Sequence, residues 1–244
     1  MVSFERRDPF PFVTEGKFSK SEAKAHASEV DTYLGLRIGP IEARLNQLGS
    51  KSPAPSASGE HQQLWFGLDP QDLLTPYLEI RATLESIDLK NRKHIVDLGA
   101  AYGRMGFVIE RHFPEQKFTG YEYVGERVVE GASALKRFGA KRATLEHADL
   151  TSAKFQIPDA DVFFIYDYGT PKAIEKTLFD LRKMALRKNI LIVARGRNCR
   201  YSIESKHPWL SKTNPLAPES AITLYHSNQN LRLDRVESPV EHGI

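Results

Sequence analysis

The stretch HIVDLGAAYGRMG, residues 94–106, decides how this 244-residue chain is interpreted. Its first residues are mostly apolar and predict a short strand that ends around Asp97. Gly99, Ala101 and Gly103 then form a loop of small residues that opens directly into a helix. Small residues are needed where a ligand approaches the backbone closely, because a larger side chain would occupy the ligand's space. The stretch is therefore typical of a nucleotide-cofactor turn.

Acidic residues at the ends of the next two strands strengthen this interpretation, since purely structural turns also use glycine. The segment KFTGYEY predicts a strand with Glu122 at its end, where a carboxylate can accept hydrogen bonds from both ribose hydroxyls. The segment ATLEHADL predicts a third strand that ends in Asp149, where an acceptor can bind the exocyclic amine of adenine. Each carboxylate alone could instead cap a helix or form a turn. Three consecutive strands with an acidic end, counting Asp97, favour a cofactor site.

The charge beside the glycine loop indicates which cofactor is bound. Asp97 would repel the pyrophosphate of a dinucleotide but suits, directly or through water, the ammonium of a methionine moiety. Ala101 stands where the GxGxxG fingerprint has its second glycine. The predicted cofactor is therefore S-adenosylmethionine and not NAD. The predicted binding residues are Asp97, Gly99, Ala101, Gly103, Glu122 and Asp149.

The motifs VDLGAAYGRMG, YEY and HADL resemble motifs I, II and III of class I S-adenosylmethionine-dependent methyltransferases, over roughly residues 90–195. The resemblance implies a seven-stranded sheet with the cofactor across its carboxyl edge. Ala101 departs from the commoner glycine of motif I. Thr75-Pro76-Tyr77 and the compact loop are also similar to protein-lysine methyltransferases outside the SET group, of the disruptor-of-telomeric-silencing and mitochondrial c-subunit types. That resemblance implies a protein side chain as methyl acceptor, with lysine first.

Alternating strand and helix patterns predict the fold of the main domain. Parallel strands joined by right-handed helical crossovers give an α/β, doubly wound, Rossmann-like sheet. Before the first strand, apolar positions from Leu73 to Ile87 step by four and three and predict a core-facing helix, with a break at Thr75-Pro76. Residues 220–238 predict a terminal β-hairpin around the polar turn Ser-Asn-Gln-Asn.

The N-terminal third of the chain predicts smaller units. Residues 1–49 are expected to form an arm and a peripheral helical element, which starts with a capping box at Ser19 and Glu22 and continues to about Leu48. Residues 50–63 are rich in small residues and proline and predict a linker. The methyltransferase domain is then expected over residues 64–244.

The segment DVFFIYDYGTP, residues 161–171, carries the candidate catalytic residues. Asp167 and Tyr168 end the fourth strand at the rim where open α/β sheets bind ligands. For a lysine acceptor, Asp167 would orient the deprotonated amine and Tyr168 would wall a narrow channel. The segment lacks the Asn/Asp-Pro-Pro-aromatic run of enzymes that methylate the amines of nucleic-acid bases. Tyr166 is expected to be buried within the central strand.

A basic segment supports a second hypothesis. Arg195, Arg197 and Arg200 are expected in a loop after the fifth strand, at the same rim as the cofactor. A nucleic-acid methyltransferase that uses these arginines is therefore the alternative to a protein methyltransferase. A non-catalytic cofactor-binding or interaction module is a further alternative, and an NAD-dependent oxidoreductase is the least favoured.

Composition limits the other classes of protein. The eight histidines show no ligand-like spacing, so no metal site is predicted. The longest apolar runs are too short to span a bilayer, and the N-terminus lacks the apolar core of a secretory signal. The single cysteine, Cys199, suits a reducing compartment. These features predict a cytoplasmic protein with no membrane partner.

Overall fold

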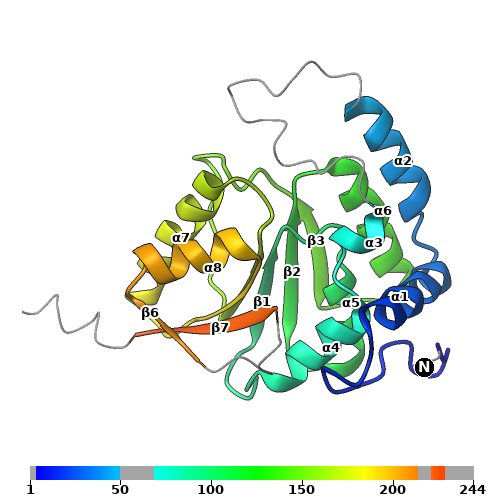
Figure 1. Ribbon diagram of the computed structural model, residues 1–244, viewed down its shortest axis with the longest axis horizontal. Helices are drawn as coiled ribbons and strands as arrows, with labels where there is room; N and C mark the ends of the chain where they lie inside the picture. Colours follow the sequence, from blue (N-terminus) through cyan, green and yellow to red (C-terminus); the bar gives the residue numbers. More distant parts are fainter. Residues whose placement is uncertain (1–3, 50–68, 214–220, 229–244) are drawn as a thin grey trace, which may run out of the picture.

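A seven-stranded sheet organises the protein, whose computed structural model describes residues 4–49, 69–213 and 221–228 (Figure 1). The strands run in the order β3-β2-β1-β4-β5-β7-β6. The first five are parallel, and β7 is antiparallel to both β5 and β6. The strands are β1 (His94–Leu98), β2 (Lys117–Glu122), β3 (Ala143–His147), β4 (Val162–Tyr166), β5 (Leu191–Arg195), β6 (Leu210–Lys212) and β7 (Ile222–Ser227). The predicted α/β, doubly wound, seven-stranded sheet is confirmed.

Helices cover both faces of this sheet and create two apolar cores (Figure 1). On one face lie α4 (Tyr77–Ser86), α5 (Arg104–His112) and α6 (Gly125–Phe138), and on the other lie α7 (Pro171–Ala185) and α8 (Arg197–Lys206). Side chains of a strand alternate between faces. In β4, Val162 and Phe164 therefore join the first core, and Phe163 and Ile165 join the second. The same alternation places Tyr166, the last residue of β4, on the face of α4 and α5.

The strand order reverses at β1. The chain first continues from β1 to β2 and β3 on one side, and it then crosses to β4 and β5 on the other side. In open α/β sheets, ligands bind outside the carboxyl ends of the strands at this switch point. The loop after β1 and the residues that end β2 and β4 therefore meet at one place, as the sequence analysis requires for a cofactor site.

The N-terminal helices pack directly on the sheet domain. They are α1 (Lys20–Leu34), α2 (Ile38–Gly49) and the short α3 (Pro70–Leu73). The predicted capping box is present, since Ser19 accepts from the Glu22 amide and Glu22 accepts from the Ser19 amide. The expected helical stretch is two helices, because Gly35 adopts φ 67° and ends α1. Apolar residues of both helices belong to the core that contains α4 and α5.

The break at Thr75-Pro76 is also confirmed, since α3 ends at Leu73 and α4 begins at Tyr77. The predicted linker, residues 50–63, lies outside the described residues. So does the second strand of the predicted terminal hairpin, which follows residue 230. The first strand of that hairpin is β7. Within the described residues it pairs with β6, and β6 is a strand that the sequence did not predict.

The segment after β5 was expected to be a basic loop, and that expectation is wrong because residues 197–206 form α8. Gly196, at φ 100°, turns the chain into this helix. The cap of this helix is Asp167, whose carboxylate accepts hydrogen bonds from the amides of Asn198 and Cys199. Asp167 precedes both α7 and β5 in the chain. A helix whose cap is so distant in sequence carries no local start signal of the kind that Ser19 gives for α1.

Candidate functional site

The loop after β1 is a tight turn stabilised by the neighbouring strand. The amides of Gly99 and Ala100 both donate to the carbonyl of Tyr121, at 2.9 Å. Gly99, Ala101 and Gly103 adopt φ values of 97°, 48° and 72°, in the left-handed region. A Cβ atom on Gly99 would lie 2.3 Å from Cβ of Tyr168, so glycine is also required there by the close approach of this side chain. The predicted cofactor loop thus has a backbone conformation that residues with larger side chains rarely adopt.

Glu122 ends β2 and is fixed against this loop. One carboxylate oxygen accepts from the Ala101 amide at 2.9 Å, and the other accepts from the Val124 amide at 2.9 Å. The residue is only 6% exposed, yet it lines a cavity of about 270 Å³. Each oxygen keeps a second lone pair. The carboxylate is therefore rigidly placed and able to accept further hydrogen bonds from a ligand in the cavity.

A buried ionic chain that the sequence analysis missed supports Glu122 from behind. Nη1 of Arg127 lies 3.7 Å from the Glu122 carboxylate. The same guanidinium donates two hydrogen bonds to Glu42 of α2, both at 2.8 Å, and the Tyr102 hydroxyl donates to Glu42 at 2.7 Å. Glu42 and Arg127 also line the 270 Å³ cavity. The N-terminal helix α2 thus contributes to the wall of the candidate cofactor site.

Asp97 lies beneath the loop and lines a small adjoining hollow of about 70 Å³. Burial, and secondarily the negative charge of Glu122, raises the pKa of Asp97 to about 7. A cationic group in that hollow would favour the ionised form. The contact between Asp97 and an ammonium stays a prediction.

Asp149 follows β3 and makes local hydrogen bonds. Its Oδ1 accepts from the amide of Thr151 at 2.8 Å and from the hydroxyl of Thr151 at 2.6 Å. The neighbouring Leu150, and not Asp149, lines the 270 Å³ cavity. Asp149 therefore forms the turn that was its alternative role, and its contact with adenine stays a prediction.

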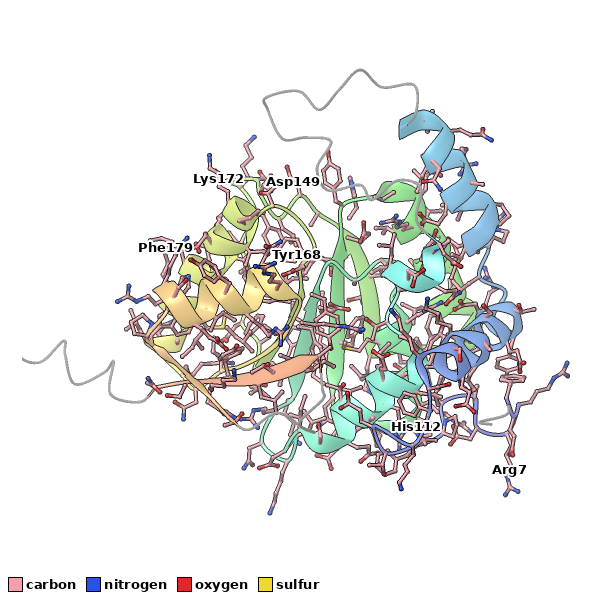
Figure 2. All side chains as sticks on the ribbon, in the orientation of Figure 1. Arg7, His112, Asp149, Tyr168, Lys172 and Phe179 are labelled. Carbon is pink, nitrogen blue, oxygen red and sulfur yellow. The ribbon has the colours of Figure 1, made fainter. Side chains whose placement is uncertain are left out.

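The two predicted catalytic residues direct their polar groups towards helices. Asp167 has φ 39° and accepts from the amides of Asn198 at 3.0 Å and Cys199 at 2.7 Å. The Tyr168 hydroxyl hydrogen-bonds to Thr177 of α7 at 2.5 Å. Figure 2 shows Tyr168 at the same edge of the sheet as Asp149. Both residues line the 270 Å³ cavity, although their polar groups are engaged elsewhere, and their catalytic role stays a prediction.

The contact between Asp167 and α8 gives a stability prediction. We expect Asp167→Ala to lower the free energy of unfolding by about 0.5 to 2 kcal/mol, because two helix N-terminal amides lose their acceptor. Asp167→Asn keeps one carbonyl oxygen and should lose less. Urea unfolding followed by circular dichroism measures both variants. An Asp167→Ala protein as stable as wild type would show that the cap does not stabilise the fold.

Three hollows meet at Tyr166. The 270 Å³ cavity, the 70 Å³ hollow with Asp97, and a hollow of about 200 Å³ on the side of α1 all count Tyr166 among their lining residues. From the sequence, this ring was predicted to be buried within the central strand. It is only partly buried, because β4 ends there and the chain turns away at Asp167.

The arginines at the end of β5 are partly engaged. Arg195 forms an ion pair with Glu79 at 2.8 Å and lies 5.8 Å above the Tyr166 ring. Arg200 donates to the carbonyl of Gly196 at 3.1 Å. Arg197 is exposed at the start of α8. The predicted anion-binding rim therefore has one exposed arginine and two with internal partners.

Within residues 4–49, 69–213 and 221–228, no group of three or more histidine, cysteine, aspartate or glutamate side chains could hold a metal ion. No helix of this part of the chain is long and apolar enough to cross a bilayer.

Comparisons by sequence find no match, either to a family model or to a curated protein. Solved structures do align. The tRNA (uracil-54, C5)-methyltransferase of Pyrococcus abyssi, in complex with S-adenosyl-L-homocysteine, aligns at 11% identity and TM-score 0.43, over 62% of this chain and 38% of that one. A SAM-dependent methyltransferase from Aquifex aeolicus aligns at 12% identity and TM-score 0.46, over 61% and 88%. Human N-acetylserotonin methyltransferase, in complex with SAM, aligns at 14% identity and TM-score 0.43, over 62% and 51%.

All three structures are methyltransferases by name, and the two names that include an acceptor describe a tRNA and N-acetylserotonin. This chain spans less than two thirds of the length of two of them. At identities of 11 to 14% and TM-scores below 0.5, the chemistry of this chain has to be derived from its own residues.

Proposed function

We propose that the protein is an S-adenosylmethionine-dependent methyltransferase. The observation that carries this proposal is the Glu122 carboxylate, fixed by the amides of Ala101 and Val124 on the wall of a cavity at the switch point of the sheet. A carboxylate in this place can accept hydrogen bonds from the two hydroxyls of a ribose. The cavity volume of about 270 Å³ lies near the lower end of the range for small-molecule sites, roughly 300 Å³ upwards.

The residues around the cavity fit the parts of this cofactor. Glu122 would hold the ribose, and the loop from Gly99 to Gly103 would lie against the methionine moiety. Asp97 would face the ammonium. Leu150 supplies an apolar wall for the adenine ring, and Asp149 is proposed to accept from the adenine amine.

Within this function, we propose a protein side chain as the acceptor, with lysine first. The ion pair of Arg195 with Glu79 neutralises one of the three arginines of the predicted rim, which disfavours the alternative RNA or DNA substrate. The proposed location is the cytoplasm.

Isothermal calorimetry tests the cofactor assignment. We expect binding of S-adenosylmethionine and S-adenosylhomocysteine and no binding of NAD. Equal or tighter binding of NAD would overturn the assignment. Incubation with tritiated S-adenosylmethionine and a native lysate then tests the acceptor. If protease releases the label from the macromolecular fraction, the acceptor is a protein. If nuclease releases it, the acceptor is a nucleic acid.

The raised pKa of Asp97 predicts proton release on cofactor binding. Because the free carboxyl has a pKa of about 7 and a bound ammonium favours its ionised form, binding near pH 7 should release part of one proton. Calorimetry in phosphate and in Tris, which differ in ionisation enthalpy, measures this release. Asp97→Asn should abolish the difference between buffers, and equal heats with the wild-type protein would contradict the prediction.

The same group affects stability in the absence of cofactor. The folded pKa lies above the ordinary value of 3.8, so between about pH 4 and pH 7 the folded state binds more protons than the unfolded state. The contribution of Asp97 to stability therefore falls as pH rises through this window. Asp97→Asn should flatten that dependence, which thermal unfolding at a series of pH values measures.

A further inference from the structure

Three residues in a row at the end of β4 differ in what their polar groups contact. The carboxylate of Asp167 accepts from α8, and the Tyr168 hydroxyl bonds to α7. The Tyr166 hydroxyl forms no hydrogen bond with any residue in the described ranges, although its ring lines three hollows. The Tyr166 oxygen is also not among the fully buried polar atoms that lack a partner in these ranges, so solvent reaches it from the hollows. It is well placed to contact a ligand.

Tyr166 stands where the candidate cofactor cavity adjoins the hollow of about 200 Å³. Both spaces are lined by Asp72, Leu73, Leu74, Tyr166 and Asp167. The second hollow extends from there to α1, to the start of α4 and to the end of β5. A molecule in this hollow could therefore reach the cofactor cavity beside the Tyr166 ring.

The charged groups that line the 200 Å³ hollow are paired. Lys24 of α1 forms an ion pair with Asp72, and Arg195 forms one with Glu79 at 2.8 Å. Lys20, at the outer rim, lies 3.9 Å from Asp72. The hollow thus offers no concentrated positive field for a phosphate. Asp167, which also lines it, is held by two amides of α8, and the carboxylates of Asp97 and Glu15 act on the Tyr166 hydroxyl from outside the hollow.

The remaining wall suits a flexible alkyl chain better than a base. Leu73, Leu74 and Pro76 supply apolar surface. Proteins that read single-stranded nucleic acids stack bases on aromatic rings, but among the described lining residues Tyr166 alone is aromatic, and the Arg195 guanidinium lies over its ring. Burial raises the pKa of Tyr166 well above its usual value, so its hydroxyl stays neutral and acts by hydrogen bonding.

We propose that the 200 Å³ hollow receives the methyl acceptor, an alkyl amine such as a lysine side chain, and that the oxygen of the Tyr166 hydroxyl accepts a hydrogen bond from its N–H group. This inference rests on the proposed methyltransferase function. In the transfer, the amine lone pair forms the N–CH₃ bond, the S–CH₃ bond breaks with its electron pair going to sulfur, and the product ammonium loses a proton to solvent. The amine has to lose its own proton to solvent before the transfer, and by holding the remaining N–H group Tyr166 would leave the lone pair free to point at the methyl carbon.

Analogues that join cofactor and acceptor test this proposal without a known substrate. In such compounds a nitrogen replaces the sulfur of S-adenosylhomocysteine and carries an aminoalkyl arm of varied length. We expect the best arm to bind wild-type protein more tightly than S-adenosylhomocysteine does. Tyr166→Phe should reduce the gain from the arm about 2- to 12-fold, the equivalent of one neutral hydrogen bond, and leave the affinity for S-adenosylhomocysteine unchanged.

Tyr201→Phe is the matched control, because it removes a hydroxyl from an exposed tyrosine of α8 that lines none of the three hollows. It should bind every compound as wild type does. Thermal unfolding gives a second measurement: Tyr166→Phe loses no hydrogen bond to the described residues and should melt at or above the wild-type temperature. A clearly lower melting temperature would show that the hydroxyl has a structural partner and would contradict the proposal.

The remaining outcomes separate this inference from the proposed function. If S-adenosylhomocysteine binds but no arm improves affinity, or if Tyr166→Phe keeps the full gain, the inference is overturned and the function stands. If an arm that ends in cytosine outperforms every aminoalkyl arm, the acceptor is a base and the inference is overturned. If neither S-adenosylmethionine nor S-adenosylhomocysteine binds, the proposed function itself fails.

Discussion

Arg104→Ala is expected to lower the free energy of unfolding by about 3 to 5 kcal/mol, because it leaves the buried carboxylate of Asp31 without its cationic partner. Arg104 and Asp31 are each only 4% exposed. The guanidinium pairs with both oxygens of Asp31, donates to the Thr75 carbonyl at 3.2 Å and to Gln71 at 2.9 Å, and lies 5.1 Å above the Tyr77 ring. This network joins α1 to α3, to the Thr75-Pro76 break and to α5.

A loss of this size is a large part of the total stability of a typical domain, about 5 to 15 kcal/mol. Urea unfolding measures it. Arg44→Ala is the matched control, since Arg44 pairs with Glu126 on the surface, where such pairs contribute less than about 1 kcal/mol. The double variant Asp31→Ala with Arg104→Ala should lose less than the sum of the single variants, because neither charge is then left alone. Equal losses for Arg104→Ala and Arg44→Ala would show that the buried network contributes no more than a surface pair.

Glu122→Ala is expected to weaken S-adenosylmethionine binding about 10- to 150-fold, since hydrogen bonds to a charged acceptor contribute roughly 1.5 to 3 kcal/mol. The structure adds a second consequence. The amides of Ala101 and Val124 lose their acceptor, and Arg127 loses a neighbouring charge. The alanine variant should therefore also be less stable than wild type.

Glu122→Gln separates these two effects, because its carbonyl oxygen keeps one of the backbone hydrogen bonds. Calorimetry should show weaker cofactor binding in a protein that is still folded by circular dichroism. Glu126→Gln is the control. Glu126 pairs with Arg44 on the surface and does not line the 270 Å³ cavity, so this variant should bind the cofactor as wild type does. Wild-type affinity in folded Glu122→Gln and Glu122→Ala would remove Glu122 from the site.

The elements that the sequence predicted well depend on neighbouring residues. The Ser19 capping box, the break at Thr75-Pro76 and the alternation of strands and helices all follow from backbone rules that act within a few residues. The carboxyl-edge position of Glu122 follows from the same rules, because parallel strands bring their ends to one edge.

The elements that the sequence did not predict depend on contacts between distant segments. Glu42 joins the cavity wall because α2 packs on α6, and the pairing of Glu42 with Arg127 spans 85 residues. The helix α8 was expected to be a loop, since its cap is a carboxylate that lies 31 residues before it in the chain. Neither contact leaves a local pattern.

The end of β4 shows where the two kinds of information meet. The sequence by itself placed Asp167 and Tyr168 at the rim of the site and Tyr166 inside the central strand, and strand alternation assigns neighbouring side chains to opposite faces. Only the tertiary structure decided which of the three polar groups stays without a partner. The positive φ of Asp167 turns its carboxylate to α8, the close approach of Tyr168 to Gly99 carries its hydroxyl to α7, and Tyr166 remains open to the hollows. These directions are set by helices that fold onto the strand from elsewhere in the chain, so no local rule contains them.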